Sequence, residues 1–548
     1  MCYECGDVFH NVEGLPAFEE FGLEEERNYG YEFTPSGITK VHDSELVDHE
    51  HVGGGHDHSA HHSHGMAAHT HDATGNLRRN GNGHPASDGG VHVPQSSAPA
   101  PRYPSIDISG YDDLLEYARE LVNKQKMSWD AGEHSDLELG ARPGAGYDMH
   151  DGEFERVLMV VEDNYDHRVP EAIADAMREK GAEVDIVTVE KVPDEIDPWE
   201  HELPGVRYGL KWGHPLLNMK GVRWWEDLAE EDPHYDMLVY GVGGPNRKLE
   251  TDTEYQRIPW RLEEDLVSPA NTFPTPVWDA INKKTAEVVN DAEEVHLTDP
   301  EGTDLTFTNY DEDGIYFKRD APGHIFGHPS FLTPEADTTG VIAGTINHAG
   351  AFPRIEVELN DAKVVDVRGG GTFGQMWREM LDETEGIQYP GLPGPGLFWL
   401  WEMAIGTHPK VSRPPAEDIS RVQYPEIERR RSGIIHCGFG IQYQIEPYAA
   451  KLGDIPWGHV HVHLNFANYE ATMSDGSTVT LIDDGHLTTL DHPDVREVAS
   501  EYGDPDELLT EDWIPAVPGV NEEGDYMDDY ASDPAEWIER EMEEQARK

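Results

Sequence analysis

The feature that most constrains the fold is the alternation of residue types in the segment 458–466. In an extended strand, successive side chains face opposite sides. One side of this segment carries His459, His461, His463 and Asn465, and the other carries Val460, Val462, Leu464 and Phe466. The pattern predicts a strand that packs its apolar face on a core and presents imidazoles to a cavity. Such a strand is suited to bind a metal.

Charge limits the kind of surface and the kind of partner. The chain has 548 residues and a formal net charge of -67, from 108 acidic and 41 basic side chains. The acidic residues are spread along the whole length, which is typical of a salt-adapted surface. Molar salt screens charges beyond about 3 Å, so the repulsion becomes tolerable. Nucleic acid and anionic membranes are therefore not expected as partners.

Cysteine usage and hydropathy indicate the compartment. The three cysteines, Cys2, Cys5 and Cys437, cannot form a disulfide framework, and a reducing environment is expected. The N-terminus lacks a basic region followed by an apolar core, and no apolar run approaches the ~18 residues of a membrane span. We expect a cytoplasmic protein without membrane segments.

Residues 1–104 form a histidine- and glycine-rich extension that cannot bury a core and is expected to be mostly disordered. Its histidines cluster at His49, His51, His56, His58, His61, His62, His64, His69 and His71. Such a tract can capture Ni, Zn, Cu or Fe, because neutral imidazole is a borderline-soft ligand. Two interpretations remain open: a metal-loading arm, and a low-complexity linker with incidental affinity.

Residues 105–285 predict an N-terminal α/β domain. The buried-strand pattern at 157–161, the helical pattern at 170–180 and the strand pattern at 184–189 follow one another. A strand, helix and strand in this order indicate a right-handed crossover and a largely parallel sheet. Residues 105–285 contain no GxGxxG motif and no Walker loop, so a nucleotide cofactor is not indicated for this domain.

Residues 286–520 predict a strand-rich α/β domain that binds metal. Strand patterns at 295–298 and 304–308 flank a Pro/Gly turn, and those at 355–359 and 364–367 flank a polar turn. A short helix is expected around 376–381. Residues 521–548 form an acidic tail. The predicted class is therefore α/β, with a parallel N-terminal sheet and a strand-rich C-terminal domain.

The chemistry of this second domain centres on Glu402, His436, Tyr443 and the histidine strand. Imidazole and carboxylate together suit Zn, Fe, Mn or Co, and an open position can activate water. If the segment around His436 is a strand, Cys437 points to the opposite side. It is then expected to be a small buried hydrophobe, not a catalytic thiolate.

Four segments resemble the aminopeptidase T family of metallo-exopeptidases. They are Val295–Leu305, Glu402–Pro409, the run from Gly433 to Tyr443, and the final histidine strand with its Asp484-Gly485 turn. The similarity covers most of residues 150–500. It implies a two-domain α/β protein, usually a dimer, whose C-terminal domain holds two divalent metals and a bridging water that attacks a peptide carbonyl.

The resemblance also implies site residues. Glu402 matches the family's second glutamate, His436 its histidine and Tyr443 its tyrosine, while His328 stands where the first glutamate is expected. For the family's His-x-Asp pair, the chain offers His461-Val462-His463 or His463-Leu464-Asn465, neither of which ends in a carboxylate.

The missing carboxylates reduce the expected metal content to one divalent ion per chain. Two ions about 3.5 to 4 Å apart would repel each other with little compensation from one glutamate. The predicted ligands are His436, His461, His463, Glu402, His328 and His459, with Tyr443 and Glu402 as catalytic residues.

Three functions follow. The first is a metal-dependent hydrolase that acts on a peptide or small-molecule substrate, has no nucleic-acid or membrane partner, and is expected to be a homodimer. The second is a mononuclear non-haem iron ring-cleaving dioxygenase of the dihydroxypyridine type, because one carboxylate with histidines suits such iron sites. The third is a metal storage or delivery protein with a histidine-rich arm.

Overall fold

The structure is a computed structural model. It describes residues 29–34, 37–42, 97–125, 146–162, 165–189, 228–240, 251–258, 260–308, 324–326, 337–347, 350–389, 392–413, 429–440 and 459–546. The histidine-rich tract at 49–71 lies outside the described residues. Within the first 96 residues the description covers an antiparallel pair, β1 (Tyr29–Thr34) and β2 (Gly37–His42).

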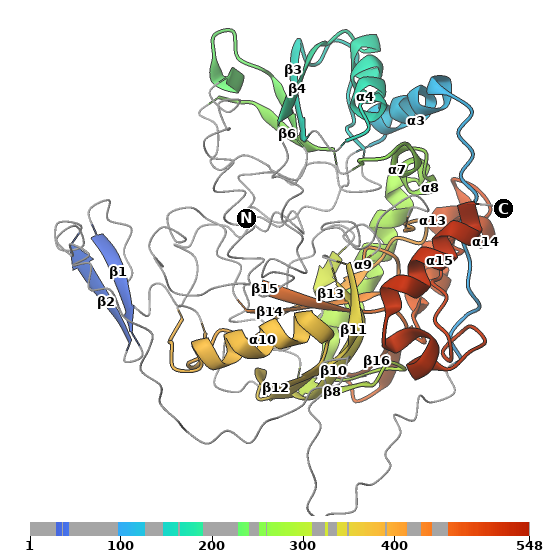
Figure 1. The fold of residues 1–548 in the computed structure, drawn as a ribbon. Helices are drawn as coiled ribbons and strands as arrows, with labels where there is room; N and C mark the ends of the chain where they lie inside the picture. Colours follow the sequence, from blue (N-terminus) through green and yellow to red (C-terminus); the bar gives the residue numbers. More distant parts are fainter. Residues whose placement is uncertain are drawn as a thin grey trace, which may run out of the picture.

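The N-terminal part contains a four-stranded parallel sheet. Its strands are β3 (Arg156–Glu162), β4 (Glu183–Val189), β5 (Met237–Tyr240) and β6 (Glu254–Arg257), in the order β4-β3-β5-β6. Helix α4 (Arg168–Glu179) connects β3 to β4, and α3 (Tyr111–Asn123) packs against α4 (Figure 1). The apolar run Val157–Val161 is buried, as expected for a parallel strand covered by helices. The predicted parallel sheet is confirmed.

The C-terminal part contains an eight-stranded antiparallel sheet. Its strands are β7 (Ala292–Asp299), β8 (Thr303–Thr308), β10 (Thr339–Asn347), β11 (Gly350–Asn360), β12 (Lys363–Gly369), β16 (Asn468–Met473), β17 (Thr478–Asp483) and β18 (His486–Leu487). Their order is β12-β11-β10-β8-β7-β16-β17-β18. The predicted hairpin is present as β7 and β8, and the Gly302 amide donates to the Asp299 carbonyl across its turn, at 2.9 Å.

A second antiparallel sheet positions the candidate site. It contains β9 (His324–Phe326), β13 (Leu400–Gly406), β14 (Ile435–Gly440) and β15 (His459–Leu464), in the order β15-β14-β13-β9. Strand β15 packs against β10 of the larger sheet. Helix α10 (Gly371–Thr384) adds aromatic packing, because the Trp377 ring contacts Phe398 and Phe439. The predicted α/β class is confirmed by the parallel sheet and the strand-rich C-terminal part.

Three helices lie between the two parts: α7 (Glu263–Leu266), α8 (Pro269–Thr272) and α9 (Thr275–Asp291). The boundary expected between residues 285 and 286 falls inside α9. The Trp278 indole on this helix donates to the Thr407 hydroxyl at 3.0 Å, just after β13. Buried apolar residues from α3, α9 and both C-terminal sheets belong to one continuous core.

The C-terminal segment is packed on the domain. It includes η4 (Thr488–Asp491), α13 (Pro493–Ser500), α14 (Pro505–Leu508), the π-helical turn η5 (Tyr526–Ala531) and α15 (Pro534–Ala546). Helix α15 lies against β11, and Ile538 and Met542 are buried (Figure 1). The segment expected as an acidic tail therefore contributes a second, smaller apolar core.

Two buried carboxyl groups at the β7–β8 turn help to hold this segment. The Tyr526 hydroxyl donates to Glu301 Oε2 at 3.1 Å, and the Phe466 amide donates to Asp299 Oδ2 at 3.1 Å. Burial raises the pKa of both carboxyl groups, and repulsion from Asp299 adds to the rise for Glu301. The Thr345 and Tyr526 hydroxyls donate hydrogen bonds to Glu301, which lowers its pKa and partly offsets this rise.

The segment that precedes α3 crosses the same region. We call residues 97–103 the N-terminal strap. Arg102 forms an antiparallel bridge with Ile514, and the Tyr103 hydroxyl accepts a hydrogen bond from the Ala516 amide at 3.2 Å. Among the described helices, none has the length and apolar composition needed to cross a membrane.

Candidate functional site

Strands β14 and β15 bring histidines together on one face of the smaller sheet. His436 pairs directly with His463, while His461 and His459 lie opposite Gly438 and Gly440. Directly paired residues in an antiparallel sheet share a face. We call the positions His436, His459, His461 and His463 the histidine face. Both residues that oppose His461 and His459 on β14 are glycines and carry no side chain.

The reverse side of β15 is apolar. Val460, Val462 and Leu464 are buried, and they belong to the main core. A Cβ atom added at Gly344 of β10 would come within 2.7 Å of Val462 Cγ1, so β10 packs closely against this side. The predicted division of β15 into an imidazole face and an apolar face is confirmed. Cys437 is buried and unoxidised on the apolar side, as expected for a small hydrophobe.

Three imidazole rings of the histidine face are in contact. His436 Nδ1 lies 3.0 Å from His463 Nε2. The ring centroids of His436 and His461 are 4.2 Å apart at 30°, and those of His436 and His463 are 5.0 Å apart at 51°. All three side chains are buried, with at most 3% of their surface exposed. The cluster is therefore a polar centre inside the protein.

A buried cation adjoins the cluster. Arg429 Nη1 lies 3.5 Å from His436 Nε2, and the side chains of Arg429, Arg430 and Arg431 are all buried. Local sequence patterns do not predict that these arginines are buried. Two features of the sequence could have pointed to this region. They are the run of three arginines in so acidic a chain and the glycines that alternate with His436 along β14.

The structure describes some of the predicted site residues and not others. His436, His461 and His463 are brought together. Glu402 pairs with Gly438, which pairs with His461, so position 402 occupies the same row across the sheet. The side chains of Glu402 and His459 lie outside the description, as do His328 and Tyr443 entirely. The roles assigned to all these residues remain predictions.

The described donors can be compared with the needs of a metal. Two nitrogens that bind one ion at about 2.0–2.1 Å in tetrahedral or octahedral geometry lie roughly 3 Å apart. The 3.0 Å between His436 Nδ1 and His463 Nε2 fits this spacing. Within the described residues, no group of three or more His, Cys, Asp or Glu side chains is arranged to hold an ion. The described pair thus fits part of a ligand set, to which other residues must add.

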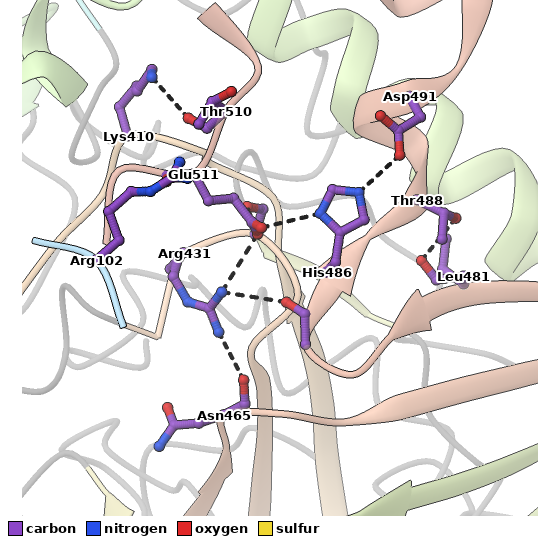
Figure 2. A network of polar contacts seen from close by, with 12 residues as sticks. Arg102, Lys410, Arg431, Asn465, Leu481, His486, Thr488, Asp491, Thr510 and Glu511 are labelled. Carbon is purple, nitrogen blue, oxygen red and sulfur yellow. Dashed lines mark hydrogen bonds and ion pairs between the residues drawn. The ribbon is translucent and has the colours of Figure 1, made fainter. Parts of the chain in front are cut away.

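A second polar centre lies beside the N-terminal strap, around Glu511 (Figure 2). Its carboxylate accepts from the Ser432 hydroxyl at 2.6 Å, lies 3.4 Å from Arg431 Nη1, and contacts His486 Nδ1 at 3.1 Å. The other nitrogen of His486 lies 2.9 Å from Asp491 Oδ2. We call Glu511 and these four partners the Glu511 centre.

Charge is balanced within the Glu511 centre. The pKa of His486 rises to about 9, mainly because of the hydrogen bond between His486 and Glu511, and Asp491 adds to the rise. His486 is therefore a cation at neutral pH, held between two carboxylates. A cavity of about 520 Å³ opens beside it, lined among others by Ser97, Arg102 and Asp484. Because both ring nitrogens of His486 contact carboxylates, the centre is suited to a structural role.

Comparison with known proteins adds two remote likenesses. No protein-family model and no curated protein matches the chain. Among solved structures, 2,5-dihydroxypyridine dioxygenase from Pseudomonas putida KT2440 has 12% identity and a TM-score of 0.36, covering 69% of this chain and 98% of that one. Wild-type AmpT from Thermus thermophilus has 14% identity and a TM-score of 0.36, covering 69% and 99%. Activity must therefore be argued from the residues of this chain.

Proposed function

We propose that the chain is a metal-dependent hydrolase that cleaves an amide or peptide bond. The supporting observation is the buried pair of imidazole nitrogens, His436 Nδ1 and His463 Nε2, at 3.0 Å on adjacent strands. Imidazole nitrogens are common metal ligands, and the three contacting rings place several of them together inside the protein. The resemblance of the surrounding segments to aminopeptidase T is consistent with hydrolysis.

In this proposal His436 and His463 hold one divalent ion, and His461 and Glu402 complete the ligand set. His459 and His328 remain further candidates, and Tyr443 stabilises the developing oxyanion. A bound Zn, Fe, Co or Mn ion would supply an activated water and polarise the substrate carbonyl. The apolar packing behind β15 fixes the imidazoles in place, so that little reorganisation is needed on binding.

Metal analysis of the protein purified in molar KCl tests the proposal. We expect one ion per chain and aminopeptidase or amidase activity that a chelator removes. His461→Ala should lose the ion while its thermal unfolding stays close to that of the wild type. His296→Ala is the matched control, since this histidine is half-exposed on β7. Metal-free wild type, or two ions per chain, would contradict the single-ion site.

A second candidate is a mononuclear non-haem iron dioxygenase that opens dihydroxylated aromatic rings. It is favoured by the nitrogen-rich character of the described cluster, whose three side chains are all imidazoles. One iron per chain, with oxygen consumption on a dihydroxypyridine and no hydrolysis of peptides, would support it over the hydrolase. The storage or delivery function rests on the histidine-rich tract and remains a prediction from sequence.

A further inference from the structure

The turn between β7 and β8 carries two carboxyl groups that are buried beneath the C-terminal segment. Asp299 is 5% exposed and Glu301 is 2% exposed. Glu301 Oε2 accepts a hydrogen bond from the Tyr526 hydroxyl at 3.1 Å, and Oε1 accepts one from the Thr345 hydroxyl at 3.3 Å. The Thr345 hydroxyl in turn lies 3.1 Å from the Tyr530 hydroxyl. Because both tyrosines belong to η5, the Glu301 carboxyl is a polar contact point for this segment.

The two carboxyl groups differ in the donors that they receive. Asp299 accepts hydrogen bonds from two backbone amides, that of Glu301 at 2.8 Å and that of Phe466 at 3.1 Å, and both favour its charged form. Glu301 receives the two hydroxyls instead and lies beside the Asp299 carboxyl. Burial and repulsion from Asp299 raise the pKa of Glu301 more than its hydroxyl partners lower it. Of the two groups, Glu301 therefore holds its proton to the higher pH.

The nearby cation, Arg354 on β11, compensates the Glu301 carboxyl only from a distance. Its Nε donates to the backbone carbonyl of Glu301 at 2.6 Å, and its Nη1 donates to Glu356 Oε1 at 2.8 Å. The hydrogen bonds of the guanidinium thus go to the Glu301 main chain and to another carboxylate. Its charge lowers the pKa of Glu301, but this effect is smaller than that of burial.

The other elements that pack on this turn do not relieve the repulsion. Asp484, which follows β17, adds a negative charge that raises the pKa of Asp299 further. Strand β10 contributes Thr345 and has no ionisable side chain. Helix α15 packs Ile538 and Met542 into the second core, and the acidic residues of η5 are exposed: Asp528 and Asp529. An ionised Glu301 would therefore share a buried site with a second carboxylate.

We propose that the Glu301 carboxyl is a proton-dependent latch for the C-terminal segment 526–546, which stays docked while Glu301 is protonated and opens more readily once the proton is lost. Opening moves both tyrosines of η5 away and lets water reach the carboxyl. Opening therefore releases one proton, and a rising pH favours the open form. This inference does not depend on the proposed metal-dependent function.

The sign and the pH range of the latch follow from the two states of Glu301. In the open form its pKa is that of an ordinary glutamic acid, about 4.3. In the docked form its pKa is raised to about 8. Because the docked form binds the proton more tightly, its extra stability is complete below the lower value and is lost as the pH rises toward the higher one.

Hydrogen exchange measured by mass spectrometry in molar KCl tests the latch. The exchange of α15 is divided at each pH by that of α13, whose apolar residues belong to the main core. From about pH 5 to about pH 8 this ratio should rise by up to about tenfold per pH unit, because opening releases one proton. In Glu301→Gln, which keeps the shape of the side chain but cannot ionise, the ratio should stay nearly constant.

Glu536→Gln is the matched control, because it removes an exposed carboxylate from the first turn of α15 and should keep the pH dependence of the wild type. A wild-type ratio that does not change with pH would overturn the inference, whether or not a variant folds. The same pH dependence in folded Glu301→Gln would overturn it as well. Metal content is measured separately, so the latch and the proposed function can fail independently.

Discussion

The three described imidazoles of the histidine face and the Glu511 centre are both polar groups with buried members, but they differ in how their charges are arranged. In the Glu511 centre, two cations and two carboxylates alternate from Arg431 through Glu511 and His486 to Asp491. On the histidine face, the described side chains are three imidazoles and the guanidinium of Arg429, all of them neutral or positive. The first centre pairs opposite charges, whereas the second gathers imidazoles that can serve as metal ligands.

This difference provides a way to distinguish buried polar groups that stabilise the fold from those that bind a ligand. A balanced centre should lose stability when one member is removed, because a buried charge is left uncompensated. A ligand cluster should lose binding when one member is removed, with a smaller effect on the fold. The following changes, ordered from the largest expected effect to the smallest, test this distinction.

The largest effect is expected behind the histidine face. Val462→Asp places a carboxylate in the core between β15 and β10, where no partner is available among the described neighbours. The C-terminal part should fail to fold, because an unpaired buried charge costs several kcal/mol or more. Circular dichroism and thermal unfolding in molar KCl measure this. Val365→Asp is the control, since Val365 is 53% exposed and should tolerate the change. A folded Val462→Asp protein would show that the face assignment is wrong.

The second-largest loss of stability is expected at the Glu511 centre. Glu511→Ala leaves Arg431 buried without its carboxylate and should reduce the free energy of unfolding by about 3–5 kcal/mol. Chemical denaturation measures the change. Asp491→Asn removes the other carboxylate that contacts His486. Because Asp491 is 70% exposed, its loss should reduce the free energy of unfolding by less than about 1 kcal/mol. Similar losses in the two variants would show that burial does not set the strength of this centre.

The smallest effect concerns pH. The pKa of His486 is raised to about 9 in the folded protein, chiefly by its hydrogen bond to Glu511. Its contribution to stability should be complete below about pH 6.5 and lost as the pH rises toward about 9, because the unfolded state binds its proton less tightly. The side chain is 34% exposed, so solvent limits the change to on the order of 1 kcal/mol. The free energy of unfolding from pH 6 to pH 10 should fall less steeply in His486→Gln; identical slopes would contradict the assignment.

Much of the fold could be predicted because its strands and helices have clear periodicity. The run Val157–Val161 and the later strand pattern at 184–189 flank a helix, and they pair in parallel as β3 and β4. The alternation at 459–466 predicted the two faces of β15, since a strand with a period of two has few other ways to bury its valines. In both cases, local pattern and tertiary packing agree.

The candidate site could be predicted only in part. His461 and His463 share a face within one strand, but their contact with His436 depends on the register between β14 and β15, which local periodicity does not determine. Arg429 and Glu511 were missed because charged side chains are mostly exposed, and the run of three arginines, although unusual in so acidic a chain, does not by itself show that they are buried. Long-range pairing is thus the information that the sequence pattern lacks.

The N-terminal strap sets a practical limit on how the histidine-rich arm can be studied. Arg102 Nη1 donates to the Glu511 carbonyl at 2.9 Å, and the side-chain amide of Asn521 donates to the Pro99 carbonyl at 2.9 Å. A deletion that ends at residue 104 therefore removes part of the folded domain together with the arm. Cutting before Ser97 keeps these contacts, so that any change in metal uptake reports on the arm itself and not on a damaged scaffold.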